Sequence, residues 1–259
     1  MRAFLFKFDM KNKKYRPPGF LGIGVMKGGT TWTWQQMKKH PEIGAPKTFR
    51  GKRTKEFHFF DRLNMSLKQY LKSFGKLDQK AVGEFTPNYF SCPYAPLMIK
   101  TLLPNVKLFV LLRNPTDRAF SHYKDHLYYK KIEPNVSFID AFNENHPKCE
   151  LLPYSIKSKG MYGDLLENWY KHFDDKQLKV MFYDDMVDNP VEFLKNVFRW
   201  VGVDENFIPP DYTEKVVKKY NKAYDDMKLD PIHRGIVSEF YAPQVAKLSK
   251  LTGRKLTWR

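Results

Sequence analysis

The sequence predicts an α/β fold with three layers, in which helices cover both faces of a central parallel sheet. Two observations predict it. Short, continuously apolar segments recur along the 259-residue chain, and segments with helical periodicity lie between and after them. An apolar run without alternation is typical of a strand buried on both faces, and strands that alternate with helices form parallel sheets.

Four apolar segments are the expected strands. The first covers 20–25 (FLGIGV), and the second covers 80–85 (KAVGEF). The third, 106–112 (VKLFVLL), is the most distinct because the turn signals PN and RNP lie on either side of it. Residues 178–184 (LKVMFYD) form the fourth.

The expected helices follow these strands. Residues 30–40 (TTWTWQQMKKH) come after the first strand, and 190–203 open with a proline, which is favoured at the first position of a helix. Two more helices are marked by apolar residues at helical spacing: Leu165, Leu166, Trp169, Tyr170 and Phe173 in one, and Ile236, Val237, Phe240 and Leu248 in the other.

The composition is that of a folded protein, with 42% hydrophobic and 16% aromatic residues. The length suits one α/β domain or two small ones. Because no internal repeat or low-complexity linker interrupts the sequence, we expect a single domain over 1–259, with 1–18 as an N-terminal extension.

The charge balance indicates an anionic partner. Lys and Arg number 45 and Asp and Glu number 28, so the net charge is +17. Such an excess favours nucleic acid, a polyanionic glycan, a membrane surface or a phosphorylated cofactor, and a generally basic, solvated surface is the alternative.

Cysteine usage and hydropathy indicate a soluble, cytoplasmic protein. Cys92 and Cys149 lie far apart without metal or redox spacing, so free thiols in a reducing compartment are expected. The N-terminal apolar patch is too short for a signal peptide, and no segment approaches the ~20 apolar residues of a membrane span.

The loop after the first expected strand, MKGGTT, has the composition of an anion site. Gly28 and Gly29 let the backbone approach a ligand closely. The N–H groups that open the following helix attract an anion. Thr30 and Thr31 add hydroxyl donors, and Lys27 adds a positive charge.

The lysine of this loop precedes the glycines, unlike that of nucleotide triphosphatases. Their pattern, G-x-x-x-x-G-K-[ST], places the lysine after the last glycine. Gly24 and Gly29 have the spacing of that pattern, but Thr30 stands where its lysine belongs. A P-loop kinase therefore stays an alternative, and so does a Gly-Gly pair that forms only a tight turn.

A second loop, in LFVLLRNPTDRAFSHY, follows the third expected strand. Arg113 stands at the end of that strand, Pro115 opens a helix, and Ser121 lies two turns further on. Ligands of parallel sheets bind beyond the carboxyl ends of the strands. An arginine and a serine placed there can hold a second phosphate, so the two loops together predict a ligand with two separated phosphate groups.

Four motifs in this order, GVMKGGTT, KEFHFFD, EFTPNYF and LLRNPTDRAFSHY, resemble those of the PAPS-dependent sulfotransferases. The chain is most similar to the glycan-modifying branch that includes heparan sulfate sulfotransferases, and to its bacterial and phage relatives. The resemblance runs from Phe20 to Trp258, and the terminal LTGRKLTW also resembles the end of that branch.

The resemblance implies the family's three-layer α/β fold, PAPS as sulfuryl donor and PAP as product. The transfer chemistry itself requires no metal, and the sequence shows no cluster of metal ligands. The resemblance implies that Glu56 is the general base, with His58 beside it. It also implies three groups of donor-binding residues: Lys27, Gly28, Gly29, Thr30 and Thr31 for the 5′-phosphosulfate, Arg113 and Ser121 for the 3′-phosphate, and Lys222 as the counterpart of a basic loop that contacts the nucleotide.

The chemistry of sulfuryl transfer agrees with these roles. As in phosphoryl transfer, catalysis consists mainly of positioning and of neutralising charge. A lysine at the position of Lys27 is useful beside the bridging oxygen, where negative charge grows. The acceptor hydroxyl must lose a proton, and a carboxylate such as Glu56 can take it, typically for ~10²–10⁴-fold in rate.

Each assignment has an alternative. Glu56 could have no catalytic role and merely form an ion pair with Lys55 or Arg53. His58 could be a histidine that is only packed and hydrogen-bonded in the core. Glu84, which precedes FTPNYF, is a competing base that we interpret as structural or substrate-orienting. The tryptophans of the segment WTW, Trp32 and Trp34, are expected to pack rather than to stack on adenine.

The chain departs from the heparan-type pattern at two places. Those enzymes have E-K-[TS] where this chain reads EFT, so Phe85 replaces a lysine. No cysteine follows Cys149, whereas the eukaryotic enzymes carry a C-terminal cysteine pair. The missing charge at position 85 argues against a heparan-like polyanion as acceptor. The missing cysteine pair, together with YNKAYDDMKLDP in place of the family's basic KGR loop, favours a cytoplasmic, bacterial or phage-type relative over a Golgi enzyme.

The sequence therefore predicts a sulfotransferase that acts on a hydroxyl of a carbohydrate or glycolipid, without nucleic acid as partner. A non-catalytic nucleotide- or polyanion-binding protein is the alternative from another class, since the charge of +17 alone would explain it.

Overall fold

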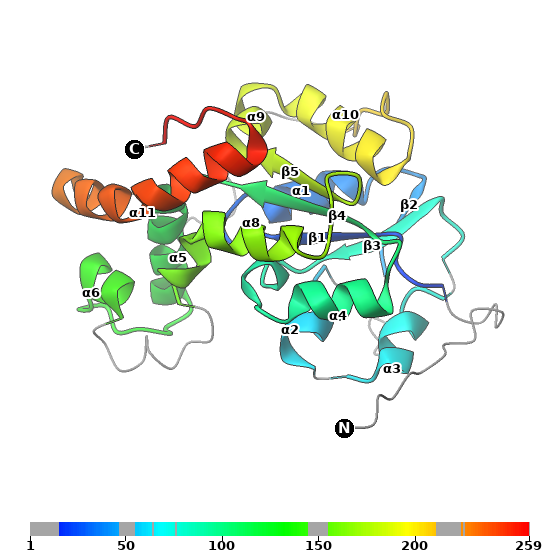
Figure 1. The fold of residues 1–259 in the computed structure, drawn as a ribbon, viewed down its shortest axis with the longest axis horizontal. Helices are drawn as coiled ribbons and strands as arrows, with labels where there is room; N and C mark the ends of the chain where they lie inside the picture. Colours follow the sequence, from blue (N-terminus) through cyan, green and yellow to red (C-terminus); the bar gives the residue numbers. More distant parts are fainter. Residues whose placement is uncertain are drawn as a thin grey trace.

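The computed structural model describes residues 16–46, 55–63, 65–75, 77–144, 155–210, 224 and 226–258. Within these ranges a five-stranded parallel sheet has the order β2-β3-β1-β4-β5. Figure 1 shows the sheet at the centre of the molecule. Its strands are β1 (Phe20–Gly24), β2 (Ile43–Gly44), β3 (Ala81–Phe85), β4 (Lys107–Leu112) and β5 (Leu178–Phe182).

Helices cover both faces of this sheet (Figure 1). One face packs against α2 (Phe59–Arg62), α3 (Leu67–Lys72), α4 (Ala95–Leu102) and α8 (Tyr162–Tyr170). The other packs against α1 (Thr30–Met37), α9 (Tyr183–Asp188) and α10 (Pro190–Val201). The expected three-layer α/β fold is therefore confirmed.

The central strand β4 explains why apolar residues run continuously through this part of the sequence. Leu108, Val110 and Leu112 belong to the apolar cluster on one face, and Phe109 and Leu111 belong to the cluster on the other. Successive side chains of a strand point to opposite faces, so a strand covered on both sides needs apolar residues at every position.

A third apolar cluster lies at one end of the sheet, where α5 (Pro115–Tyr128), α6 (Phe138–Asn143) and α11 (Pro231–Thr252) pack together (Figure 1). The helix α5 begins three residues after β4 ends, so it starts at the carboxyl end of the sheet. Asn114 caps it by accepting hydrogen bonds from the backbone of Thr116 and Asp117. This cap fixes where the helix leaves the strand.

The remaining described elements are two short 3-10 helices, η1 (Tyr89–Ser91) and η2 (Ser158–Gly160). Each of the four predicted strands contains an observed strand, but 178–184 ends early because α9 begins at Tyr183. The single domain over 1–259 and its extension over 1–18 stay predictions.

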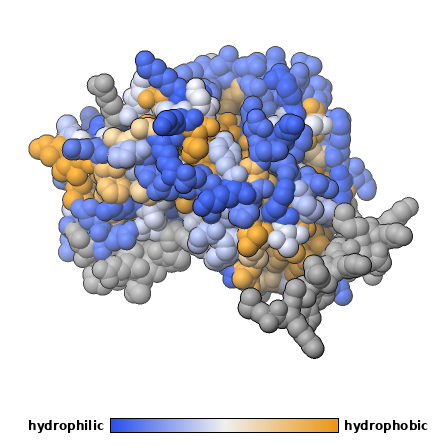
Figure 2. Space-filling model, in the orientation of Figure 1, coloured by the Kyte–Doolittle hydropathy of each residue, from blue (hydrophilic) through white to orange (hydrophobic). Residues whose placement is uncertain are grey.

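The molecular surface is mostly hydrophilic on the face drawn in Figure 2. An apolar patch appears at the left of that view, and Ile232 and Ile236 at the start of α11 are exposed. None of the described helices combines the length and the apolar character that crossing a bilayer requires. The cytoplasmic location stays a prediction.

Candidate active site

The loop between β1 and α1 favours glycine at two positions. A Cβ on Gly28 would lie 2.6 Å from the carbonyl oxygen of Leu111 in β4. Gly29 has φ of +93°, a left-handed conformation that side chains disfavour, and its Cβ would lie 2.8 Å from Met186. The two glycines therefore let the loop lie close against the sheet, with Lys27 ahead of them.

The helix α1 begins at Thr30, directly after these glycines. The N–H groups of a first helical turn have no partner within the helix, and the helix dipole adds positive potential there. Thr30 is buried and Thr31 is exposed, and both hydroxyls contact the ammonium of Lys55 at 3.2 Å. This combination of backbone, hydroxyl and ammonium donors fits a phosphate or sulfate group.

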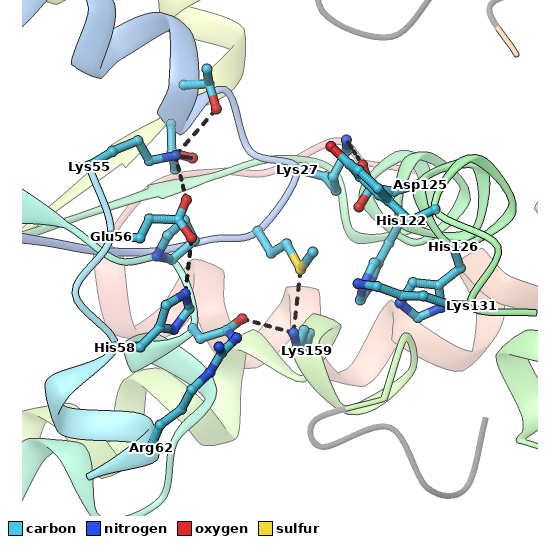
Figure 3. Close-up of a pocket in the computed structure, with 16 residues that line it drawn as sticks. Lys27, Lys55, Glu56, His58, Arg62, His122, Asp125, His126, Lys131 and Lys159 are labelled. Carbon is cyan, nitrogen blue, oxygen red and sulfur yellow. Dashed lines mark hydrogen bonds and ion pairs between the residues drawn. The ribbon is translucent and has the colours of Figure 1, made fainter. Parts of the chain in front are cut away.

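A cavity of about 420 Å³ opens in front of this loop (Figure 3). Three groups of residues line it: Met26, Lys27, Thr30 and Thr31 from the loop and α1, Lys55, Glu56, His58, Arg62, Pro87 and Asn88 from the segments beside β3, and His122, Asp125, His126, Tyr129, Lys131 and Lys159 from the helical end.

A chain of charged contacts forms one wall of the cavity (Figure 3). The ammonium of Lys55 lies 2.9 Å from Oε1 of Glu56, and Oε2 of Glu56 lies 3.2 Å from Nε2 of His58. The other ring nitrogen of His58 lies 2.9 Å from Oδ2 of Asp61. The carboxylate of Glu56 is therefore held between two cationic groups at the cavity surface.

These contacts control two pKa values. Burial raises the pKa of Glu56, but the hydrogen bond from His58 and the charge of Lys55 outweigh it and lower the pKa to about 2. Burial lowers the pKa of His58, but its hydrogen bonds to Asp61 and Glu56 prevail and raise the pKa to about 9. At neutral pH the pair is therefore a carboxylate and an imidazolium.

Comparison with protein families decides which family this fold belongs to. Residues 17–236 match the family described as Sulfotransferase domain. The chain belongs to the sulfotransferase family.

Relatives of known activity agree with this assignment. Human heparan sulfate glucosamine 3-O-sulfotransferase 3B1 is 24% identical over 274 residues, which cover 97% of this chain and 67% of the human protein. Human heparan sulfate glucosamine 3-O-sulfotransferase 5 is 26% identical, over 93% of this chain and 74% of the human protein. The expected PAPS-dependent family and enzyme class are confirmed.

A solved structure agrees as well. The sulfotransferase from Alicyclobacillus acidocaldarius has a TM-score of 0.78 and 25% sequence identity, and the match covers 93% of this chain and 98% of that one. The shared fold extends over nearly the whole length of both proteins.

The opposite wall of the cavity in this sulfotransferase is basic. Lys159 lies on η2 and donates hydrogen bonds to Asn88 at 2.9 Å and to the sulfur of Met26 at 3.4 Å. Burial and the charges of Arg118 and Lys131 lower the pKa of Lys159 to about 7. Binding of an anion at this wall would therefore be favourable.

Two histidines of α5 complete that wall. The rings of His122 and His126 lie 4.3 Å apart between centroids, and both side chains are buried. Burial and the charges of Lys131 and Lys159 lower the pKa of His126 to about 4. Among the described residues, Nδ1 of His126 has no hydrogen-bond partner.

The loop lysine itself points to α5. The ammonium of Lys27 lies 2.8 Å from Oδ1 of Asp125. Arg113, at the end of β4, donates to the carbonyl oxygen of Lys27 at 3.3 Å, and its guanidinium lies 4.7 Å from the ring centroid of Tyr183. Arg113 therefore lies beside the loop.

The sequence-predicted residues thus fall into three groups. Lys27, Thr30, Thr31, Glu56 and His58 line one cavity. Four predicted residues lie outside its lining: Gly28 and Gly29 in the loop, Arg113 at the end of β4, and Ser121, which is buried on α5. Lys222 is outside the described residues.

Glu84 lies in a buried network of hydrogen bonds. It is fully buried and accepts hydrogen bonds from the hydroxyls of Tyr70, Tyr89 and Thr86 and from the backbone of Phe57. Burial raises the pKa of Glu84 to about 7 despite these bonds. Because Phe57 lies between Glu56 and His58, this buried carboxyl anchors the segment that carries both.

Two aromatic expectations can be compared with the structure. Trp32 and Trp34 are buried in the cluster between α1 and α10, so they pack. Phe85 is also buried there, and a Cβ on Gly22 would lie 2.3 Å from its ring. The aromatic ring at position 85 is therefore accommodated by a glycine on the neighbouring strand.

Sequence reasoning missed the basic wall and Asp125. A signal for part of it exists, because residues four apart share one face of a helix. Once α5 is expected after Arg113, Asp125 follows Ser121 and His126 follows His122 at that spacing. No local signal marks Lys159. Within the described ranges, no group of three or more His, Cys, Asp or Glu side chains is placed to hold a metal.

Proposed function

We propose that this sulfotransferase moves the sulfuryl group of PAPS to a hydroxyl of a carbohydrate or glycolipid, with Glu56 as general base. One observation carries the proposal: the anion-binding loop and the Glu56–His58 pair face the same cavity. A donor held by the loop and an acceptor beside Glu56 would meet there, and holding both reactants in place accounts for much of such catalysis.

PAPS supplies the sulfuryl group, and its phosphate is the leaving group. Glu56 accepts the proton of the acceptor hydroxyl while the hydroxyl oxygen forms its bond to sulfur. The bond between sulfur and the bridging oxygen breaks, and its electron pair stays on the phosphate. Lys27 and the N–H groups of α1 stabilise that charge, so the scheme needs no metal ion.

The second phosphate of the nucleotide is assigned to the loop after β4. Arg113 lies beside Lys27, and Ser121 is on the helix that this loop opens. Lys222, the expected basic contact to the nucleotide, completes the assignment.

The nature of the acceptor is supported by two observations. The human relatives are named for heparan sulfate glucosamine, a carbohydrate. The wall formed by Lys131, Lys159 and the α5 histidines lies across the cavity from Glu56 (Figure 3) and suits an acidic substituent on the sugar. We therefore infer a carbohydrate acceptor that carries an acidic group near the sulfated hydroxyl.

Incubation with ³⁵S-labelled PAPS and a panel of acidic and neutral saccharides and glycolipids tests the proposal. Labelled product is expected, with acidic members preferred. Glu56→Gln should lower the rate by ~10²–10⁴-fold without loss of PAP binding, whereas Glu239→Gln, an exposed change on α11, should leave the rate unchanged. No labelled acceptor together with no PAP binding would refute the proposal, and stabilisation by ATP–Mg²⁺ but not PAP would favour a kinase.

A further inference from the structure

The ammonium of Lys55 lies where the anion loop meets the base. It is 3.2 Å from the hydroxyl oxygens of both Thr30 and Thr31, and 2.9 Å from Oε1 of Glu56. A lysine ammonium has three N–H donors, and these contacts supply three acceptors. Lys55 therefore connects the residues assigned to the donor with the residue assigned to the acceptor.

The environment of Lys55 fixes this position. Its side chain is only 15% exposed, and its ammonium lies 5.6 Å from the centroid of the Phe85 ring. Phe85 is the position at which the heparan-type pattern has a lysine. In this chain a positive charge is present at this point of the site, but it comes from the segment that carries Glu56 and rests on the ring.

We propose that Lys55 couples binding of the donor to the strength of the base, because it divides its hydrogen bonds between Glu56 and an anion held at Thr30 and Thr31. Binding of the phosphosulfate at the loop draws the ammonium toward the anion, weakens its hold on Glu56 and makes that carboxylate a stronger base. This inference rests on the proposed function of the cavity.

The physical basis is the difference between neutral and charged acceptors. An ammonium is attracted more strongly to an anionic oxygen than to the neutral oxygen of a hydroxyl, because the full negative charge adds a Coulomb attraction. An anion at the threonines therefore replaces weak acceptors of Lys55 with strong ones. Glu56 then competes with a second anion for the same ammonium, and its affinity for a proton rises.

Among the described residues, two charged groups act on Lys55. Glu56 belongs to its own segment, and Lys27 belongs to the loop. Thr30 and Thr31 of α1 and the ring of Phe85 are uncharged. Glu56 is therefore the anion that an incoming phosphosulfate must compete with for Lys55.

Coupling between two sites is reciprocal. If an anion at the loop weakens the Lys55–Glu56 contact, then removing the charge of Glu56 must strengthen anion binding, and this gain must depend on Lys55. Binding alone can therefore test the proposal, without any measurement of turnover.

The test is a double-mutant cycle on PAP binding, measured by titration calorimetry on the wild type, K55M, E56Q and K55M/E56Q. We expect E56Q to tighten PAP binding at least fivefold when Lys55 is present and less than twofold in the K55M background. K55R keeps the charge, so the gain from E56Q should largely return in K55R/E56Q. Circular dichroism of each variant checks that it is folded.

A matched pair serves as control. Lys80 and Glu42 also form a Lys–Glu pair, at 3.8 Å and away from the cavity, and K80M, E42Q and their combination should bind PAP as the wild type does. An equal gain from E56Q with and without Lys55 would overturn the coupling while leaving the proposed function intact. Absence of PAP binding to the wild type would contradict both.

Discussion

The ammonium of Lys27 lies 2.8 Å from Oδ1 of Asp125, so the anion loop is tied by its lysine to the helix that carries Ser121. Both side chains are largely buried, at 17% and 11% exposure. A carboxylate in this position orients the lysine, and it also competes with any anion that the lysine is to bind.

Asp125→Asn should therefore tighten PAP binding by about fivefold, because a competing ion pair of about 1 kcal/mol is lost while the shape of the side chain is kept. Titration calorimetry measures the change. Asp164→Asn, which breaks an ion pair to Lys247 far from the cavity, should leave the affinity unchanged. Weaker binding in Asp125→Asn would mean that the carboxylate mainly positions the lysine.

Asp61 is expected to keep His58 protonated. Its carboxylate lies 2.9 Å from the His58 ring, and the pKa of His58 is raised to about 9 by hydrogen bonds to Asp61 and Glu56 that prevail over burial. Asp61→Asn should lower this pKa, as measured by NMR titration of the imidazole. An unchanged titration would exclude Asp61 as the cause.

The raised pKa of His58 also makes the stability of the protein depend on pH in a predictable direction. A histidine that is more basic in the folded state stabilises it fully below the unfolded pKa of about 6.5, and this contribution is lost as pH rises through about 9. The free energy of unfolding should therefore fall between these values. The fall should be smaller in Asp61→Asn, because the folded-state pKa of His58 is then closer to the unfolded one.

Substitution by alanine is expected to have opposite effects on the free energy of unfolding at Gly29 and at Gly235. Gly29 has φ of +93° and a crowded Cβ position, so Gly29→Ala should lower the free energy of unfolding by about 1–2 kcal/mol. Gly235 is within α11 with nothing near its Cβ position, so Gly235→Ala should raise it by about 0.5–1 kcal/mol. Denaturant unfolding measures both, and equal effects would contradict the role of the left-handed turn.

The parts of the fold that the sequence predicts are those with a local cause. The strand β4 is recognisable because both of its faces are buried, and α10 because proline opens it and Gly202 ends it. The strand β2 has only two residues, Ile43–Gly44, and is defined by its pairing with β3, so no local pattern marks it.

The same distinction explains the site. The loop and the Glu56–His58 pair are contiguous motifs, whereas their partners come from distant parts of the chain. Asp125 is 98 positions from Lys27, and Lys159 is 71 positions from Asn88. Such contacts depend on how α5 and η2 pack against the carboxyl end of the sheet, which a single sequence does not specify.

Glu84 provides the last prediction. Burial raises its pKa from 4.5 to about 7, so the folded state binds this proton more tightly than the unfolded state does. Its contribution to stability is present below pH 4.5 and declines as pH rises to about 7. The difference between these two pKa values corresponds to a loss of about 3 kcal/mol across that window.

The Glu84→Gln variant has no ionisable group at this position, so its stability should not decline in this way. Urea denaturation measures the unfolding free energies of the wild type and of Glu84→Gln. Between pH 4 and pH 8, the wild type should lose about 3 kcal/mol of stability relative to the variant. The exposed change Glu239→Gln should show no comparable shift. A constant difference for Glu84→Gln would mean that Glu84 stays ionised in the folded protein, with the hydroxyls of Tyr70, Tyr89 and Thr86 compensating the cost of burying its charge.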